Sequence, residues 1–369
     1  MPPWSVSLSV RRLPIKAIIY RRLSTQSQQT VRVRIGSEGY VTVDLHNFTE
    51  NPSADALIVH IPPFAFRDES SVRPIPGFLR DWPVAIHDTA FAFRWITENL
   101  MPPNNGRGNI IVYGSYLGAS LAASLSLTET RSHSRFSIRG FAAYNGIYNW
   151  TMFLPDHQIN ITKISPKSAT VMTTPYQSTH MNNLQKRIES LFDTPSNLFD
   201  PFASPSLFFH TPGILVPSSF YMSATEAAML NAKTGYEKLF IKALRPPQQA
   251  HLTFPPVDSM LKIPQALLLH DSISTNPPQR RQAKPARYAR MAVDAHNFRA
   301  QAKDLSTFMK RSIDIIELTD QGEWDDDVEQ LAGEAHGRVQ VADVGQERKD
   351  LDLSEAGQNI LLSWIRDRI

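Results

Sequence analysis

Gly114-Ser115-Tyr116-Leu117-Gly118 is the stretch of this 369-residue chain that decides its fold. It follows residues 109–113, an apolar run rich in β-branched side chains that predicts a buried strand. It precedes residues 119–129, whose small and apolar side chains predict a helix. The two glycines leave room for a sharp bend that lifts the central side chain above the sheet. Reading Gly114 and Gly118 as the glycines of such a bend puts Tyr116, not Ser115, at its apex.

Strand and helix patterns alternate along the rest of the chain. The predicted strands are residues 40–44, 57–61, 110–113, 140–144, 266–270 and 313–318. The last predicted helix has its apolar stripe between Leu353 and Ile365, and Asp352 and Glu355 have the spacing of a capping box at its start. Strands interleaved with helices predict a mostly parallel, doubly wound α/β sheet.

Several segments carry a family resemblance through their order along the chain. They are Ala56-Leu57-Ile58-Val59-His60-Ile61-Pro62-Pro63, Trp82-Pro83-Val84-Ala85-Ile86-His87-Asp88, the bend itself, Ile138-Arg139-Gly140-Phe141-Ala142-Ala143-Tyr144, and His336-Gly337. With these segments the chain resembles the α/β-hydrolase superfamily, and most of all its hormone-sensitive-lipase-like (fold-3) esterase and lipase branch, over roughly residues 40–369. The resemblance implies an α/β-hydrolase sheet, a helical cap and a site built from a nucleophile, a histidine and an acid.

The chain is expected to have three parts. Residues 1–37 form a basic leader or a disordered tail, residues 38–144 and 263–369 form the hydrolase core, and residues 145–262 form a cap-like insertion. Helices are expected in this insertion at 182–192 and 224–244. One central strand is missing from the predicted sheet, because only one convincing helix and no strand pattern lie between Ile61 and Ile110. Either the chain has lost this strand, or the sequence lacks a segment around Arg67 to Trp82.

The positive charge is concentrated in the leader. The net charge is +3, but residues 1–37 hold seven basic residues and no acidic one, which leaves 31 basic and 35 acidic residues for the remainder. A mildly acidic body argues against nucleic acid as a partner. The acid-poor leader contains arginine and serine, and it resembles a mitochondrial presequence. We therefore expect an intracellular protein, with the mitochondrion and the cytoplasm as the two alternatives.

Tyrosine is a poor replacement for serine at the apex of the bend. The phenol of Tyr116 has an ordinary pKa near 10, and its oxygen lies several ångströms further from the backbone than a serine oxygen. Ser115 is the alternative nucleophile, but as the neighbour of the apex residue it is expected to point elsewhere. Either residue is a weak candidate for covalent chemistry.

The segment expected to supply the oxyanion hole is also altered. His60-Ile61-Pro62-Pro63 stands where the lipase-like HGGG motif would be, and proline has no N–H to donate. The backbone amides of Phe64 and Leu117 are the remaining candidate donors. His60 itself is expected to be a packed histidine at the end of a strand.

The resemblance assigns the base and the acid to two further residues. His336 is the candidate base, because we expect it to follow the last strand and to precede the terminal helix, and because histidine titrates near neutrality. It also borders a run of acidic residues and can be a bystander of that solvated loop. Asp271 is the candidate acid, since it comes directly after the predicted strand 266–270.

Two functions from different classes follow from these residues. The first is a non-catalytic α/β-hydrolase-fold protein, a pseudoenzyme that acts as a binding or scaffold protein. The alternative is an active carboxylic-ester hydrolase that uses Ser115, His336 and Asp271. A small acyl or apolar ligand suits either function, and the protein partner stays open. The absence of cysteine excludes disulfides and thiolate sites, and we expect no cofactor, no metal and no integral membrane association.

Overall fold

The structure is a computed structural model in which the elements of one eight-stranded sheet are described. The residues described are 7–13, 28–35, 39–46, 56–63, 82–102, 108–154, 157, 179–209, 254–256, 259–272, 297–317 and 334–368. The predicted helix 224–244 and most of the segment around Arg67 to Trp82 lie outside these ranges.

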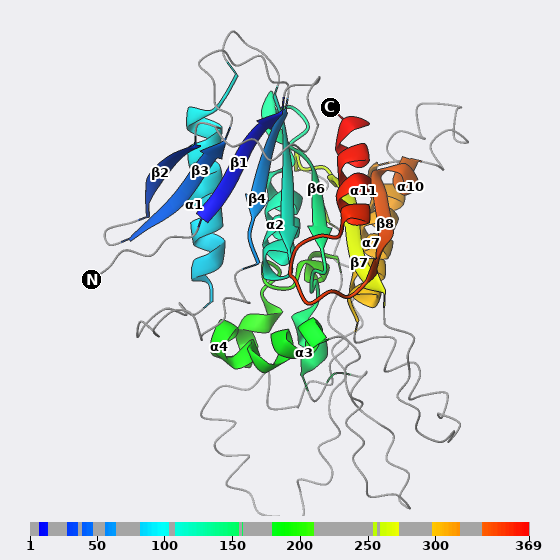
Figure 1. Cartoon of the computed structure of the whole chain (residues 1–369). Helices are drawn as coiled ribbons and strands as arrows, with labels where there is room; N and C mark the ends of the chain where they lie inside the picture. Colours follow the sequence, from blue (N-terminus) through cyan, green and yellow to red (C-terminus); the bar gives the residue numbers. More distant parts are fainter. Residues whose placement is uncertain are drawn as a thin grey trace, which may run out of the picture.

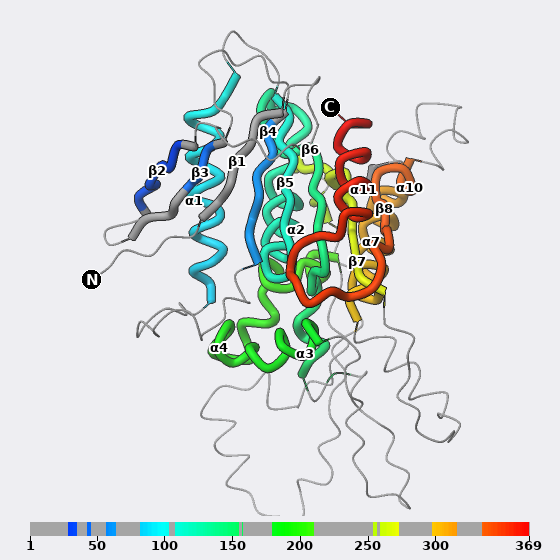
Figure 2. Tube along the Cα trace, in the orientation of Figure 1, coloured from blue at the N-terminus to red at the C-terminus, as the bar shows by residue number. Residues whose placement is uncertain are grey.

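The sheet has the strand order β2-β3-β1-β4-β5-β6-β7-β8. Its strands are β1 (Ser7–Leu13), β2 (Gln28–Ile35), β3 (Gly39–His46), β4 (Ala56–Ile61), β5 (Gly108–Ser115), β6 (Phe136–Tyr144), β7 (Gln265–Ser272) and β8 (Val339–Gln346). The five strands from β4 to β8 are all parallel. Figure 1 shows them side by side, and Figure 2 follows the chain through them in the same orientation. The mostly parallel α/β sheet predicted from the sequence is confirmed.

Helices cover both faces of the sheet (Figure 1). The longer ones are α1 (Val84–Asn99), α2 (Leu117–Glu129), α7 (Phe298–Ser312) and α11 (Glu355–Arg366). α11 lies on one face, and α1, α2 and α7 lie on the other. The shorter ones are α3 (Thr179–Lys186), α4 (Ile188–Phe192), α10 (Glu334–Arg338), η2 (Trp150–Phe153), η3 (Pro195–Phe199), η4 (Pro205–Phe208) and η7 (Ile313–Glu317). Within the described residues, no helix combines the length and the apolar character needed to cross a membrane.

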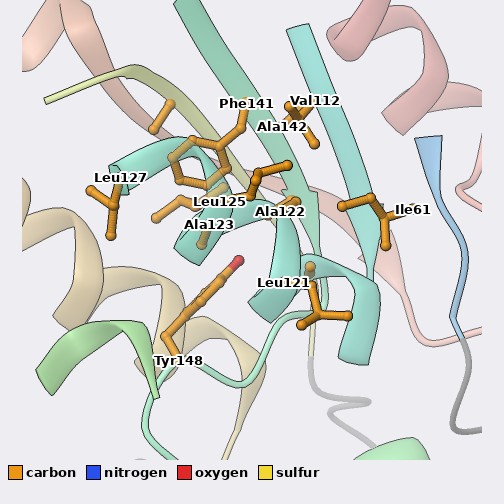
Figure 3. Packing of buried hydrophobic residues seen from close by; sticks show 14 of the residues in the cluster. Ile61, Val112, Leu121, Ala122, Ala123, Leu125, Leu127, Phe141, Ala142 and Tyr148 are labelled. Carbon is orange, nitrogen blue, oxygen red and sulfur yellow. The ribbon is translucent and has the colours of Figure 1, made fainter. Parts of the chain in front are cut away.

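The core is centred on α2, which is buried along most of its length. Small side chains allow the backbone of this helix to lie close to β5 and β6. Figure 3 shows this cluster, with Ile61, Val112, Leu121, Ala122, Ala123, Leu125, Leu127, Phe141, Ala142 and Tyr148 labelled. The close contact fixes the start of α2, and with it the bend that precedes the helix.

Two sequence predictions near the C-terminus are wrong in detail. Residues 313–318 were expected to be a strand, but Ile313–Glu317 continue α7 as a π-helical turn. A short β-branched run does not by itself distinguish a strand from the end of a buried helix. The last strand is β8, which the sequence patterns did not indicate because only two of its eight residues are buried. The cap of α11 is Ser354, whose side-chain oxygen accepts the Gly357 N–H at 3.1 Å, in place of the expected capping box.

The position beside β4 is filled by a strand from the N-terminal segment. β1 pairs with β4 on one side and with β3 on the other, while α1 connects β4 to the adjacent parallel β5. Strands β1 and β2 both come from residues 1–37, so this segment contributes to the sheet. Among the residues described, no strand lies between β4 and β5 in the chain, and the neighbour of β4 on the side away from β5 is β1, which runs antiparallel to it.

Candidate functional site

The bend after β5 requires glycine at two positions. A Cβ atom on Gly114 would lie 2.2 Å from the Gly118 carbonyl oxygen, and one on Gly118 would lie 2.5 Å from the Ile61 carbonyl oxygen. Between them, Tyr116 has φ 52° and ψ −115°, a conformation that L-residues rarely adopt. The Tyr116 N–H donates to the Tyr144 carbonyl at 2.8 Å. Packing and hydrogen bonding therefore hold a strained apex in place.

The phenol of Tyr116 is enclosed by aromatic rings. Its exposed fraction is 0%, and its ring meets Tyr144, His180 and Phe298 edge-on, with centroids 5.6, 5.4 and 5.9 Å away. Asn145 Nδ2 donates to the Tyr116 hydroxyl at 3.4 Å. Burial raises the pKa of Tyr116 to about 12. At neutral pH this group is a neutral phenol, and a phenolate nucleophile is not available.

A buried carboxylate lies beside the apex. Asp271 is on β7, and both of its side-chain oxygens accept from the Tyr144 hydroxyl, at 2.9 and 3.1 Å. The Asn145 side chain donates to Asp271 Oδ2 at 2.8 Å and accepts the Asp271 N–H at 3.0 Å. Burial raises the pKa of Asp271, and the hydrogen bonds that its carboxylate accepts from Asn145 and Tyr144 oppose the shift. The carboxylate oxygens that would accept a histidine N–H in a catalytic triad here accept the phenol of Tyr144 and the side-chain amide of Asn145.

Replacing Asp271 with asparagine should stabilise the protein at pH 7. The folded pKa of Asp271 is raised above its ordinary value of 3.8, so the folded state prefers the protonated form and ionisation is penalised at higher pH. Asparagine keeps the acceptor for Asn145 and offers an N–H to the Tyr144 oxygen. We expect a gain of about 1 kcal/mol at pH 7, because removing a buried charge removes its desolvation penalty.

Urea unfolding of Asp271→Asn and the unchanged protein between pH 3 and pH 8 measures this gain. The difference in the free energy of unfolding between the two proteins should be present above the folded pKa of Asp271. It should vanish as the pH falls below 3.8, where the aspartate is protonated in both the folded and the unfolded state. A variant that is less stable at pH 7 would contradict the prediction.

The chain between β6 and β7 closes over the apex through α3. Glu347, directly after β8, accepts the N–H groups of Thr179 and His180 at 3.1 and 2.8 Å. The His180 ring is hydrogen-bonded to the Arg348 carbonyl at 2.7 Å, through Nε2. Figure 1 shows α3 and α4 beyond the ends of β6 and β7. An imidazole in edge contact with Tyr116, that of His180, therefore comes from the segment over the sheet.

The structure does not bring the three expected catalytic residues together. Ser115 is the buried last residue of β5, and Asp271 is at the end of β7. His336 is an exposed residue of α10, which precedes β8. The expectation that His336 follows the last strand is wrong, because β8 comes after it. Since β8 is parallel to β7 and β5, His336 lies at the opposite edge of the sheet, on the order of 25 Å from the bend.

The segment after β4 presents carbonyl groups to the start of α2. The oxygens of Ile61 and Pro62 lie 2.5 and 2.6 Å from the place where a Gly118 Cβ would be. Leu117 is the buried first residue of α2, and Phe64 lies outside the described residues. The His60 ring stacks on Tyr113 at 5.2 Å between ring centroids. Two carbonyl oxygens thus lie close to the start of α2, and Pro62 has no N–H that could donate to an oxyanion.

Four residues of the site were not singled out in the sequence: Tyr144, Asn145, His180 and Glu347. Tyr144 ends a predicted strand and Asn145 follows it, which is a signal for the carboxyl edge of a parallel sheet that could have been used. Glu347 was missed because β8 was missed. His180 carries no local signal, since only the fold of the inserted segment places it over the bend. Among the residues described, no group of three or more histidine, aspartate or glutamate side chains is arranged to hold a metal ion.

Among the comparisons with known proteins, only those with solved structures find a similarity, and it lies in the path of the chain. No protein-family model matches the sequence, and no curated protein matches it significantly. Carboxyl esterase 2 from the fungus Tuber melanosporum is 11% identical with a TM-score of 0.43, over 96% of this chain and 89% of that one. The thermostable carboxylesterase EstE1 from a metagenomic library is 10% identical with a TM-score of 0.36, over 88% and 93%. A Pyrobaculum calidifontis esterase is 13% identical with a TM-score of 0.26, over 63% of this chain and 48% of that one.

Proposed function

We propose that this protein is a non-catalytic member of the α/β-hydrolase fold, of esterase or lipase ancestry, that acts as a binding or scaffold protein. The observation that carries the proposal is the apex residue: a neutral phenol with no exposed surface fills the place of the nucleophile. Its surroundings agree, since Asp271 is hydrogen-bonded to Tyr144 and Asn145. Acyl transfer needs a nucleophile in contact with a base, and two donors for the oxyanion.

The ligand that we propose is a small acyl or apolar molecule, the class expected from the resemblance to esterases. The alternative function, ester hydrolysis by Ser115, His336 and Asp271, would require His336 to act from the opposite edge of the sheet. Proton transfer needs hydrogen-bond distances of about 2.6–3.2 Å. The observed arrangement therefore favours the binding function.

Active-site labelling and turnover test the proposal together. We expect no covalent labelling by a fluorophosphonate and no hydrolysis of p-nitrophenyl butyrate above the buffer rate, because no activated serine faces a base. The matched control is Ser115→Ala, which should give the same two results as the unchanged chain. Labelling at Ser115, together with turnover that Ser115→Ala and His336→Ala abolish, would reject the proposal in favour of the hydrolase.

A further inference from the structure

β1 separates two strands that are consecutive in the chain. β3 and β4 are joined by residues 47–55, and β1 is parallel to β3 and antiparallel to β4, so β3 and β4 run in opposite directions. Figure 1 shows β1 between them. Consecutive antiparallel strands usually pair with each other directly, as in a hairpin. In this sheet β1, a strand from the N-terminal segment, lies between β3 and β4 and prevents them from pairing directly.

The register shows that β3 and β4 match each other without β1. Val10 is paired with Leu45 on β3 and with Val59 on β4. Leu45 and Val59 are both buried, with exposed fractions of 4% and 1%. If the two strands moved together, Leu45 would face Val59, and two residues along, Val43 would face Ile61, which are also both buried. Direct pairing would thus place apolar residues opposite apolar residues on the core face.

The connection from β1 to β2 has enough residues to let β1 leave the sheet. Arg11 and Gln28 are paired with the same residue, His46, from opposite sides of β3, so they are about 10 Å apart, and Leu13, the end of β1, is two residues beyond Arg11. Residues 14–27 join β1 to β2, and a chain of that length spans up to about 45 Å. The length of this connection therefore permits β1 to leave the sheet, and its two described ladders, with β3 and β4, would have to break.

We propose that residues 7–13 form an exchangeable strand of this sheet. In one state β1 lies between β3 and β4, and in the other β3 pairs directly with β4 and the N-terminal segment is released. The released residues 1–27 contain five basic residues and no acidic one, so they form a basic peptide outside the sheet. The residues of the presequence-like leader are then available only in the second state. This proposal does not depend on whether the site is catalytic.

Engineered cysteine pairs can distinguish the two states, because the chain has no cysteine of its own. Ser9→Cys with His60→Cys reports the inserted state, since these residues are register partners about 5 Å apart. Asp44→Cys with His60→Cys reports the closed state. Ser9 pairs with both, so Asp44 and His60 are about 10 Å apart while β1 is inserted, beyond the roughly 7 Å limit for a disulfide.

A third pair is the matched control. His60 and Ala142 are both register partners of Tyr113 on β5, so they are also two strands apart, in a part of the sheet without an exchangeable strand. During oxidation of the full-length protein, we expect the Ser9 and Asp44 pairs to form intramolecular disulfides and the Ala142 pair to form none. Adding Val10→Pro should speed crosslinking of the Asp44 pair by about tenfold or more, because proline cannot donate to a central ladder.

Crosslinking of the Asp44 pair no faster than the Ala142 pair would overturn the proposal, as would an unchanged rate with Val10→Pro. A Ser9–His60 disulfide between two chains would support it, because the strand must leave its own sheet to form that bond. Trypsin cleavage of the unmodified protein gives a second measurement that needs no variant. Cleavage after Arg11 or Arg12 under native conditions, well before cleavage after Arg139 of β6, is expected, and equal protection of these sites would contradict the proposal.

Discussion

Replacing Tyr116 with serine should destabilise the protein by about 3–5 kcal/mol, the usual loss when a large buried aromatic side chain is truncated. The variant should also have almost no esterase activity. The ring fills the space between Tyr144, His180 and Phe298, so a serine would leave a cavity lined by aromatic side chains. The new hydroxyl would lack the arrangement that acyl transfer needs. His336 is at the other edge of the sheet, the nearby His180 imidazole is hydrogen-bonded through Nε2 to the Arg348 carbonyl, and Pro62 has no N–H. Urea unfolding at 25 °C and p-nitrophenyl butyrate turnover measure the two effects.

Tyr116→Phe is the matched control for this variant. It keeps the ring and removes only the hydroxyl, which accepts a long hydrogen bond of 3.4 Å from Asn145. We expect a loss of at most about 1 kcal/mol, the typical net value of one hydrogen bond. Strong turnover by Tyr116→Ser would show that the prolines after β4 do not prevent oxyanion binding. If Tyr116→Ser were as stable as Tyr116→Phe, the ring would not be an important part of the core.

Replacing Asn145 with alanine should cost about 3 kcal/mol or more at pH 7, since hydrogen bonds to charged groups are worth about 1.5–3 kcal/mol and a buried N–H would lose its acceptor. The Asn145 side chain both donates to the Asp271 carboxylate and accepts the Asp271 N–H. Its backbone has φ 50°, a region that asparagine tolerates better than alanine. The carboxylate would then be held by the Tyr144 hydroxyl alone among the donors described. Thermal and urea unfolding measure the loss.

Two controls separate the causes of this loss. Asn145→Gly removes the same hydrogen bonds without the steric cost of a positive φ, so it should lose nearly as much stability as Asn145→Ala if the bonds dominate. Asn145→Ala should reduce the stability by a smaller amount when Asp271 is also replaced with asparagine. In that background no carboxylate charge loses a hydrogen-bond donor. Losses below about 1 kcal/mol for both alanine and glycine would contradict the account of Asn145 as the main support of Asp271.

The local parts of the fold could be predicted from the sequence because local patterns determine them. β5, the bend and α2 follow from a β-branched run, two glycines and a small-residue helix, and the same patterns gave β4, β6 and β7. β8 was missed because its pattern of burial is irregular, and the predicted strand at 313–318 failed because β-branched residues also end a buried helix. The insertion of β1 could not be predicted, since strand order is set by contacts between distant segments.

The candidate site was only partly predictable, for a related reason. Tyr116 and Asp271 end or follow predicted strands, so their positions on one sheet edge follow from parallel pairing. His336 was predicted at the wrong edge of the sheet because β8 was not among the predicted strands. A histidine that precedes a strand lies at the opposite edge from one that follows it. His180 and Glu347 come into contact because the inserted segment folds onto the end of β8. Neither residue has a recognisable motif around it in the sequence.

The shape of the turn after β5 does not depend on which side chain stands at its summit. Gly114 and Gly118 create the space for it, and the Tyr116 N–H to Tyr144 carbonyl bond anchors it. The residue between the two glycines could therefore be exchanged without changing the path of the backbone, and the backbone strain at this position would remain whichever side chain it carries. The geometry of this turn consequently does not by itself indicate which chemistry a chain carries out.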